Sequence, residues 1–453
     1  MDELYKSLVN IEDVEIFGGI IRGNRYLLII DLILIIHFII YWAYVVRKSN
    51  WKIDFWHTTV FVKFFFPVLI MYPFNNSKLN RYAVGKDYFD AFEEFVDLAF
   101  FITVIGYLSL YIGRFLYNTK SSHSILNNTF KPLEKIIQGN IKSLGTLALL
   151  LLTYSSFLAI VIYLQIQTNT LFNPRDYFQA NDTIRPIYNT CLSVFPVALI
   201  FVGIRMYIRK SKANITLFSL LLMSSIFLGT RSVMLEPLIT LIFLYFFYNN
   251  HKVNFRRLVQ VGIVIIFVTL LLLNLRAGRS LDKTVSNLNK DIFYGNTFSD
   301  TRDFALILSF WDFKPVNGQT YLAGMISFMP RAISEYRQQW ALSVYTNKFV
   351  GADTRYHPGF RPGSFGESFF NFGILGVSFL GIILGYGLRH VDYSMKHIMI
   401  NEKDIIKCYS KTILWTFLLC FCISIGFYSF YIFIILNVTL AFIRQLLFQI
   451  FKP

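Results

Sequence analysis

The stretch RYHPGFRPGSFGESFFN, residues 355–371, combines residue types that bind phosphate groups and transfer protons. Arg355 and Arg361 could bind phosphate oxygens, because a guanidinium group donates two parallel hydrogen bonds. Ser364 and Glu367 have the spacing of a capping box, which predicts that a helix begins here. The free N–H groups at the start of a helix favour an anion, and the intervening glycines allow close approach to the backbone. The stretch therefore predicts a cradle for a phosphate group.

Two titratable side chains in this stretch are candidates for a catalytic base. Glu367 would take a proton from a hydroxyl nucleophile, or it would only cap the helix. His357 suits proton transfer because an imidazole has an unperturbed pKa of about 6.5, or it packs on Phe360 as a loop residue. The sequence leaves both roles open for each side chain.

Further arginines lie in and around a long loop, residues 276–365, where lysine is sparser. Arg276 and Arg279 are three residues apart and would share one helix face. Arg231 lies in GTRSVMLEP at the tip of a predicted helical hairpin, where it would contact substrate or pair with Glu236. Each arginine could also be an ordinary interfacial residue. The arginines for which we expect diphosphate binding are Arg231, Arg276, Arg279, Arg331, Arg355 and Arg361.

Motifs that bind metals or nucleotides are missing from the sequence. The lack of a Gly-x-x-x-x-Gly-Lys-Ser/Thr loop excludes an ATP-driven pump. There is no His-Glu-x-x-His and no Cys-x-x-Cys, and four cysteines are too few for a disulfide framework. There is also no Asp-x-Asp to hold a metal on a nucleotide-sugar. We therefore expect no metal and no cofactor, with arginine in the electrostatic role of a metal.

The composition places these residues in a membrane protein. Of 453 residues, 55% are hydrophobic and 15% are charged, whereas soluble domains carry about 25% charged residues. The deficit lies in long apolar runs, and a helix that spans a bilayer needs roughly 20 apolar residues. The sequence therefore predicts an all-α polytopic membrane protein with about eleven spans. The predicted spans are residues 26–46, 55–74, 95–117, 144–166, 186–208, 214–230, 232–248, 258–275, 366–388, 412–428 and 430–449.

The positions of lysine and arginine predict the orientation of these spans. In a membrane protein, a net charge of +16 is explained by cytoplasmic loops and by contact with anionic lipid more readily than by nucleic-acid binding. Loops after the first, third, fifth, seventh and ninth spans are rich in Lys and Arg and are predicted to be cytoplasmic. The N-terminus is then outside and the C-terminus inside. The predicted parts are a first membrane bundle (1–275), a large extracytoplasmic loop (276–365) and a last membrane bundle (366–453).

The predicted outer loop is unusual because the other loops are short. Long loops without a fold of their own are uncommon unless they are functional. Apolar stretches at 304–311 and 321–329 predict two short amphipathic helices that lie at the outer surface of the membrane. We therefore expect the functional site in this loop.

Several stretches resemble bacterial oligosaccharide repeat-unit polymerases, the Wzy-type O-antigen and capsule polymerases. The similar stretches are Gly229-Thr230-Arg231, Gly318-Gln-Thr-Tyr321, Met329-Pro330-Arg331 and Gly366-Glu367-Ser-Phe-Phe-Asn371-Phe-Gly373. The spacing from Arg355 to Gly366 also fits an Arg-x10-Gly pattern of some members. These motifs cover roughly residues 200–390. The odd number of predicted spans, which places the N-terminus outside, departs from the family.

The resemblance implies a GT-C-like glycosyltransferase of the bacterial inner membrane with an extracytoplasmic active site. A glycan on undecaprenyl diphosphate would be transferred en bloc onto a hydroxyl of a lipid-linked repeat unit. Arginines and a helix N-terminus would stabilise the departing diphosphate, each good donor by about 3 kcal/mol. The implied partners are two lipid-linked oligosaccharides and membrane lipid, with a chain-length regulator and a flippase as further candidates and no nucleic acid.

Three other functions stay open at this point. An O-antigen ligase would use the same donor and transfer to lipid A-core, although the Gly-Glu-x-x-x-Asn-Phe-Gly pattern favours the polymerase. A lipid-linked oligosaccharide flippase or transporter would use charges within spans, where Asp31, Lys63 and Asp97 lie. A transferase that uses a lipid monophosphate sugar would have Asp87 or Asp90 as its base.

Overall fold

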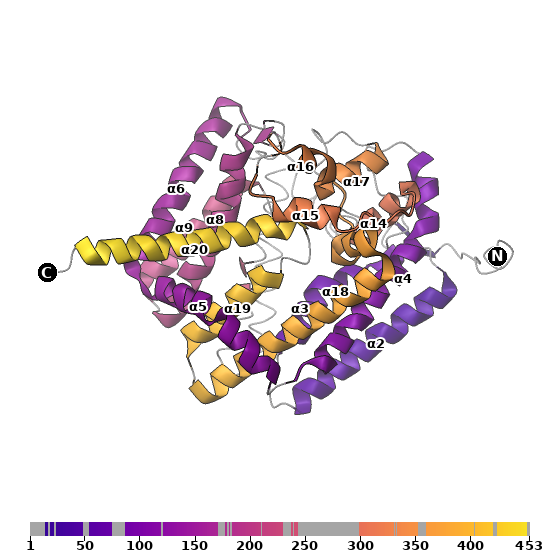
Figure 1. Cartoon of the computed structure of the whole chain (residues 1–453), viewed down its shortest axis with the longest axis horizontal. Helices are drawn as coiled ribbons and strands as arrows, with labels where there is room; N and C mark the ends of the chain where they lie inside the picture. The colour runs from indigo at the N-terminus through magenta and orange to yellow at the C-terminus, as the bar shows by residue number, and fades with distance from the viewer. Residues whose placement is uncertain are drawn as a thin grey trace. The chain divides into compact units, whose positions relative to one another are not determined.

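The computed structural model of the protein is built almost entirely from helices (Figure 1). Among the described residues, the strands are β1 (Val14–Ile16) and β2 (Gly19–Ile21), which form a short antiparallel hairpin in which Val14 pairs with Ile21. The structure describes residues 14–16, 19–21, 24–48, 54–74, 87–118, 121–170, 177–178, 181, 184–209, 211–229, 237–238, 240–242, 299–329, 331, 333–351, 359–402, 404–419 and 424–450.

Six of the described helices are long and apolar enough to cross a membrane, which confirms an all-α membrane protein. They lie at Arg25–Lys48, Phe95–Leu116, Leu144–Gln167, Arg185–Ile208, Gly363–Asn401 and Gly426–Leu446. Each matches one predicted span. The shorter apolar helices Phe55–Ile70 and Lys212–Leu228 match two more. The predicted span 258–275 lies outside the described residues, of the span 232–248 only residues 237–238 and 240–242 are described, and the span 412–428 is described at 412–419 and 424–428. The count of eleven therefore stays a prediction.

The chain forms two compact units, and each combines segments that are distant in the sequence. Unit 1 contains residues 1–118, 285–392 and 421–427. Unit 2 contains residues 119–284, 393–420 and 428–453. Each unit therefore contains residues from before and after residue 285.

Unit 1 contains the candidate site residues that the structure describes. Its helices are α2 (Arg25–Lys48), α3 (Phe55–Val60), the π-helix η1 (Phe61–Ile70), η2 (Tyr72–Phe74), α4 (Asp87–Leu116), α14 (Asp300–Phe310), α15 (Gln319–Met325), α16 (Glu335–Trp340), α17 (Leu342–Val350) and most of α18 (Gly363–His397).

The helix α14 is enclosed by protein. Every residue from Thr301 to Leu308 is buried, α14 packs along α4, and Phe304 lies edge-on against Phe370 with 5.4 Å between ring centroids. A helix is thus present where the stretch 304–311 predicted one, with Arg302 and Asp303 just before this stretch also buried. Its position at the membrane surface stays a prediction. The second predicted helix, at 321–329, corresponds to α15, while α16 and α17 were not predicted.

Glycines bring the backbones of α4 and α18 into contact. Gly381 and Gly385 of α18 are four residues apart, in the spacing that lets membrane helices approach closely. A Cβ added to Gly381 would lie 2.5 Å from the carbonyl oxygen of Gly106, and one added to Gly385 would collide with the carbonyl oxygen of Leu110. This crossing therefore has no room for side chains at these positions.

Unit 2 is a separate helical bundle. Its elements are α5 (Ser121–Lys142), α6 (Leu144–Gln167), α8 (Arg185–Ile208), α9 (Lys212–Ser224), η3 (Ser225–Leu228), η5 (Ile398–Glu402), α19 (Ile405–Leu419) and most of α20 (Ser424–Ile450). The helix α5 falls in the predicted loop after the third span, where no helix was predicted. It packs on α19.

A buried ion pair joins α5 to α19. Lys411 Nζ lies 3.7 Å from Glu134 Oε1, and these side chains are 3% and 10% exposed. Lys411 also donates to Asn127 Oδ1. Burial raises the pKa of Glu134, which Lys411 opposes, and burial lowers the pKa of Lys411, which Glu134 opposes. Each charge therefore depends on the other.

Replacing Lys411 with methionine is expected to destabilise the protein, because Glu134 would keep a buried charge without a partner. Loss of one member of a buried pair costs about 3–5 kcal/mol. Thermal unfolding of the purified protein in detergent, followed by size-exclusion chromatography, measures the change. The double variant Glu134→Leu, Lys411→Met is the control and should recover most of the loss. A single variant as stable as the unchanged protein would contradict the role of this pair.

Candidate functional site

A buried polar cluster forms where α15 meets α18. Thr320 Oγ1 donates a hydrogen bond to Glu367 Oε1 at 3.1 Å, and Asn371 Nδ2 donates to Thr320 Oγ1 at 2.7 Å. Asn371 Nδ2 also donates to the backbone carbonyl of Glu367 at 2.8 Å. All three side chains are 0% exposed. We call Thr320, Glu367 and Asn371 the Glu367 cluster.

A break in α18 positions this cluster. Gly373 has φ 65° and ψ −157°, which no residue in a regular helix adopts, so the helical hydrogen bonding of α18 is interrupted there. The carbonyls of Phe370 and Asn371 instead accept from the backbone N–H groups of Val316 and Asn317, at 2.9 and 3.0 Å. These bonds bring the segment before α15 onto α18.

The turn into α15 depends on left-handed backbone. Asn317 and Gly318 have φ values of 48° and 82°, a region that glycine and asparagine tolerate best. A Cβ added to Gly318 would lie 3.0 Å from the Phe372 ring. The turn places Thr320 at the second residue of α15, beside Glu367.

The structure changes the interpretation of Glu367 as a helix cap. The helix α18 begins at Gly363, so Ser364 lies within the helix and is not its N-cap. The Glu367 carboxylate reaches α15 through Thr320, 47 residues away. The capping box therefore predicted a helix start close to the observed one, but it gave a local reason for a residue with a long-range contact.

Carboxylates of the protein itself lie at the predicted phosphate cradle. The Arg361 backbone N–H donates to Asp303 Oδ2 at 3.2 Å, and Arg361 Nη2 donates to Ser299 Oγ at 2.9 Å. Arg361 Nε also lies 3.7 Å from Asp300 Oδ1. Arg361 is thus already engaged by acidic groups of α14.

The glycines of the predicted cradle face other parts of the chain. A Cβ added to Gly359 would lie 2.5 Å from Ser343 Cβ, one at Gly363 would lie 3.6 Å from Asp300 Cβ, and one at Gly366 would lie 2.7 Å from Pro362 Cβ. The close approach that these glycines allow is made by protein atoms. Phosphate binding at this stretch therefore stays a prediction.

Arg331 lies near the same loop. Its Nη2 donates to Ser343 Oγ at 2.6 Å, and Ser343 is the residue that packs against Gly359. Arg331 is half-buried. The structure therefore brings Arg331 to the loop that precedes α18, through Ser343.

The other site residues proposed from the sequence cannot be placed. His357, Arg231, Arg276, Arg279 and Arg355 all lie outside the described residues. Among the residues that the structure does describe, no group of three or more His, Cys, Asp or Glu side chains could hold a metal ion.

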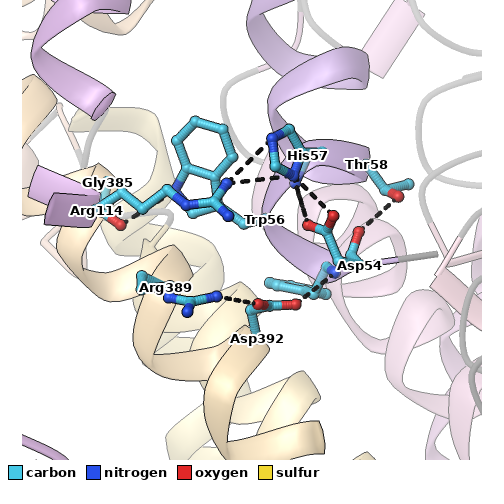
Figure 2. A network of polar contacts seen from close by, with 9 residues as sticks. Asp54, Trp56, His57, Thr58, Arg114, Gly385, Arg389 and Asp392 are labelled. Atoms are coloured by element: carbon cyan, nitrogen blue, oxygen red, sulfur yellow. Dashed lines mark hydrogen bonds and ion pairs between the residues drawn. The ribbon is translucent and has the colours of Figure 1, made fainter. Parts of the chain in front are cut away.

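A second polar cluster, which the sequence did not suggest, joins α3 to α18 (Figure 2). Asp54 is the N-cap of α3 and accepts the backbone N–H of His57 at 2.8 Å and the His57 ring Nδ1 at 2.7 Å. Asp392 of α18 accepts the Phe55 N–H at 3.0 Å and Arg389 Nη1 at 2.7 Å. The i, i+3 spacing of Asp54 and His57 at a helix start was the available signal.

Arg114 connects this second cluster to α4. Its Nη1 lies 3.1 Å from His57 Nε2, and its guanidinium lies over the Trp56 ring, 4.6 Å from the centroid (Figure 2). The same guanidinium lies 5.4 Å from the centroid of the Tyr41 ring. An aromatic face stabilises a cation. Asp54 orients the His57 ring as a catalytic carboxylate would, but the Arg114 guanidinium lies against the other ring nitrogen, Nε2. The arrangement therefore suits a strut between three helices better than a reactive base.

Comparison with models of known protein families, with curated proteins and with solved structures finds no match to this chain.

Proposed function

We propose that the chain is a membrane glycosyltransferase that extends a glycan carried on undecaprenyl diphosphate. It would transfer the growing chain en bloc onto a lipid-linked repeat unit at the outer face of the bacterial inner membrane. One observation supports this most directly. Two stretches on which the family resemblance rests, Gly318–Tyr321 and Gly366–Gly373, meet through the hydrogen bonds of the Glu367 cluster.

Burying a carboxylate in a membrane helix costs free energy, and this cost supports a functional role for the Glu367 cluster. Glu367 lies in α18, one of the helices apolar enough to span a membrane, and a buried carboxylate in a membrane helix is expensive and commonly functional. Irregular backbone such as that at Gly373 is tolerated at membrane depth only where protein or a cavity surrounds it. Together, a broken helix and a buried carboxylate are features that membrane transport and transfer sites share.

The proposed reaction needs one base and one stabilised leaving group. Glu367 takes the proton of the acceptor hydroxyl, whose oxygen forms a bond to the anomeric carbon of the donor glycan. The bond from that carbon to the diphosphate oxygen breaks, and its electron pair leaves with the lipid diphosphate. The proton on Glu367 is then released to solvent or to the departing diphosphate, which regenerates the carboxylate. His357 remains an alternative base.

Arginine would stabilise the charge on the leaving diphosphate. Arg331 is one described candidate, and its guanidinium donates a hydrogen bond to the Ser343 hydroxyl. Arg361 would first have to exchange Asp300 and Asp303 for phosphate. The proposal also includes Arg231, Arg276, Arg279 and Arg355, a GT-C-like bundle of eleven spans, and an extracytoplasmic site.

The decisive experiment is reconstitution of the purified protein in vesicles with lipid-linked repeat units of defined structure. A ladder of glycans that differ by whole repeats, with release of lipid diphosphate, would support the proposal. Movement of lipid-linked repeats across the bilayer without new glycosidic bonds would indicate a flippase. Transfer to added lipid A-core without chain growth would indicate a ligase, and either outcome would overturn the polymerase.

Replacing Arg331 with alanine is expected to lower chain extension by about 10²–10³-fold, the usual effect of removing one donor from a charge-stabilising site. Arg276→Ala and Arg355→Ala should likewise abolish long chains while the protein still reaches the membrane. Lys314→Ala is the matched control, because Lys314 is an 84% exposed cation of the same segment. Normal chain lengths in all three arginine variants would show that the diphosphate assignment is wrong.

A further inference from the structure

The hydrogen bonds within the Glu367 cluster run from Asn371 through Thr320 to Glu367. The backbone carbonyl of Glu367 can only accept, so the Asn371 amide must present its NH₂ group to it. The same NH₂ group donates to Thr320 Oγ1. The Thr320 hydroxyl therefore accepts from Asn371, and it donates its own hydrogen to Glu367 Oε1 when this carboxylate is ionised.

This direction determines the state of Glu367 that the cluster favours. A hydrogen bond donated to a carboxylate stabilises its charged form. Thr320 thus favours the ionised form of Glu367, which is the form that can accept a proton as a base. A mainly structural link would not need this polarity, because a protonated Glu367 could equally donate to the Thr320 oxygen.

The orientation of the amide also leaves one acceptor unused. With the NH₂ group directed to Thr320 and Glu367, the Asn371 Oδ1 atom points away from both. It is fully buried and has no hydrogen-bond partner among the residues that the structure describes. An unsatisfied buried acceptor costs about 1–3 kcal/mol, so a ligand that donates a hydrogen bond there would be bound preferentially.

We propose that Thr320 and Asn371 are positioning residues that hold Glu367 as the base, and that Asn371 Oδ1 accepts a hydrogen bond from a second hydroxyl of the acceptor sugar. This inference rests on the proposed function. It names the atom that would contact the substrate, Asn371 Oδ1, and the substrate class that it would bind, polyhydroxylated sugars. It also explains why an asparagine follows the glutamate by one helical turn: the four-residue spacing lets the amide reach the Glu367 carbonyl.

The positioning role is tested by infrared titration of the protein in lipid vesicles, which needs no turnover. The carboxyl band of Glu367 is identified by its loss in Glu367→Gln. In Thr320→Val, which keeps the side-chain shape and loses the hydroxyl, Glu367 should take up its proton about one to two pH units higher. Thr320→Ser should restore the original midpoint. Equal midpoints in the unchanged protein and Thr320→Val would overturn the proposal, whatever the activity.

The substrate contact is tested by the rate of transfer to acceptor repeats that each lack one hydroxyl other than the nucleophile. For one such analogue, KM should rise about tenfold or more with the unchanged protein, and this rise should disappear in Asn371→Ala. The acid limb of the pH–rate profile should also move upward in Thr320→Val but not in Thr320→Ser. If Asn371→Ala responds to every analogue as the unchanged protein does, Asn371 Oδ1 contacts no substrate hydroxyl. Failure of the unchanged protein to form polymer would instead refute the proposed function.

Discussion

Chain extension by the Glu367→Gln variant is expected to fall by about 10²–10⁴-fold, the usual contribution of a positioned base. Glutamine has nearly the same shape and still offers an oxygen to Thr320, so the contact between α15 and α18 should persist. The amide cannot take a proton from the acceptor hydroxyl at neutral pH. Reconstituted vesicles with lipid-linked repeats give the rate, and a thermal unfolding curve in detergent shows whether the fold is intact.

Glu335→Gln is the matched control for this substitution. Glu335 is an exposed residue of the short helix α16 in the same segment, and its replacement should leave the rate unchanged. A Glu367→Gln protein that is folded and extends chains at the normal rate would remove Glu367 from the mechanism. His357 would then be the remaining candidate base.

The Gly385→Leu variant is expected to yield little folded protein. At this position even a single Cβ atom would collide with the carbonyl oxygen of Leu110, and the rigid backbone of α4 cannot move aside as a side chain could. The helices would have to separate, which would also break the hydrogen bond from Trp56 Nε1 to the Gly385 carbonyl at 3.2 Å. Expression as a fluorescent fusion, followed by size-exclusion chromatography in detergent, measures the monodisperse fraction.

Two single variants on the same helix, Gly373→Ala and Leu375→Ala, serve as controls for this prediction. Leu375 is 84% exposed, and nothing lies within 4 Å of a Cβ added to Gly373. Leu375→Ala should behave as the unchanged protein, while Gly373→Ala should lose stability modestly because of its positive φ. A Gly385→Leu protein that elutes as a single folded species would show that α4 and α18 do not pack as described.

Hydropathy predicted the membrane helices well because the bilayer imposes one simple requirement, a run of apolar residues of fixed length. It gave no sign that α14 is enclosed by protein, with Arg302 and Asp303 buried beside their apolar neighbours. Burial of such a helix depends on partners in α4 and α18, which a local pattern does not contain. It also missed α5, because a helix that packs in a bundle outside a span has ordinary polarity. The Gly-x-x-x-Gly spacing at 381–385 was a usable signal for the α4–α18 contact.

The candidate site could be predicted only in part. Glu367 was selected from the sequence through a capping pattern, yet its partner Thr320 is 47 residues away. Glycines suggested an open phosphate cradle, but the space beside Gly359 and Gly366 is filled by the chain. Local spacing identifies residues that need an explanation. Their partners are set by tertiary contacts between distant parts of the chain, and local spacing in one sequence does not reveal these contacts.

The composition of unit 1 has a consequence for how the protein is made. The helix α4 ends at Leu116, whereas its partner α18 begins at Gly363. At about 5–20 residues per second, a ribosome completes α18 tens of seconds after α4 has left it. During this interval the glycine-lined flank of α4 faces lipid or an insertion chaperone. Assembly of unit 1 is therefore a late event of biosynthesis, and nascent chains cut short before residue 363 should be recognised by membrane quality-control proteases.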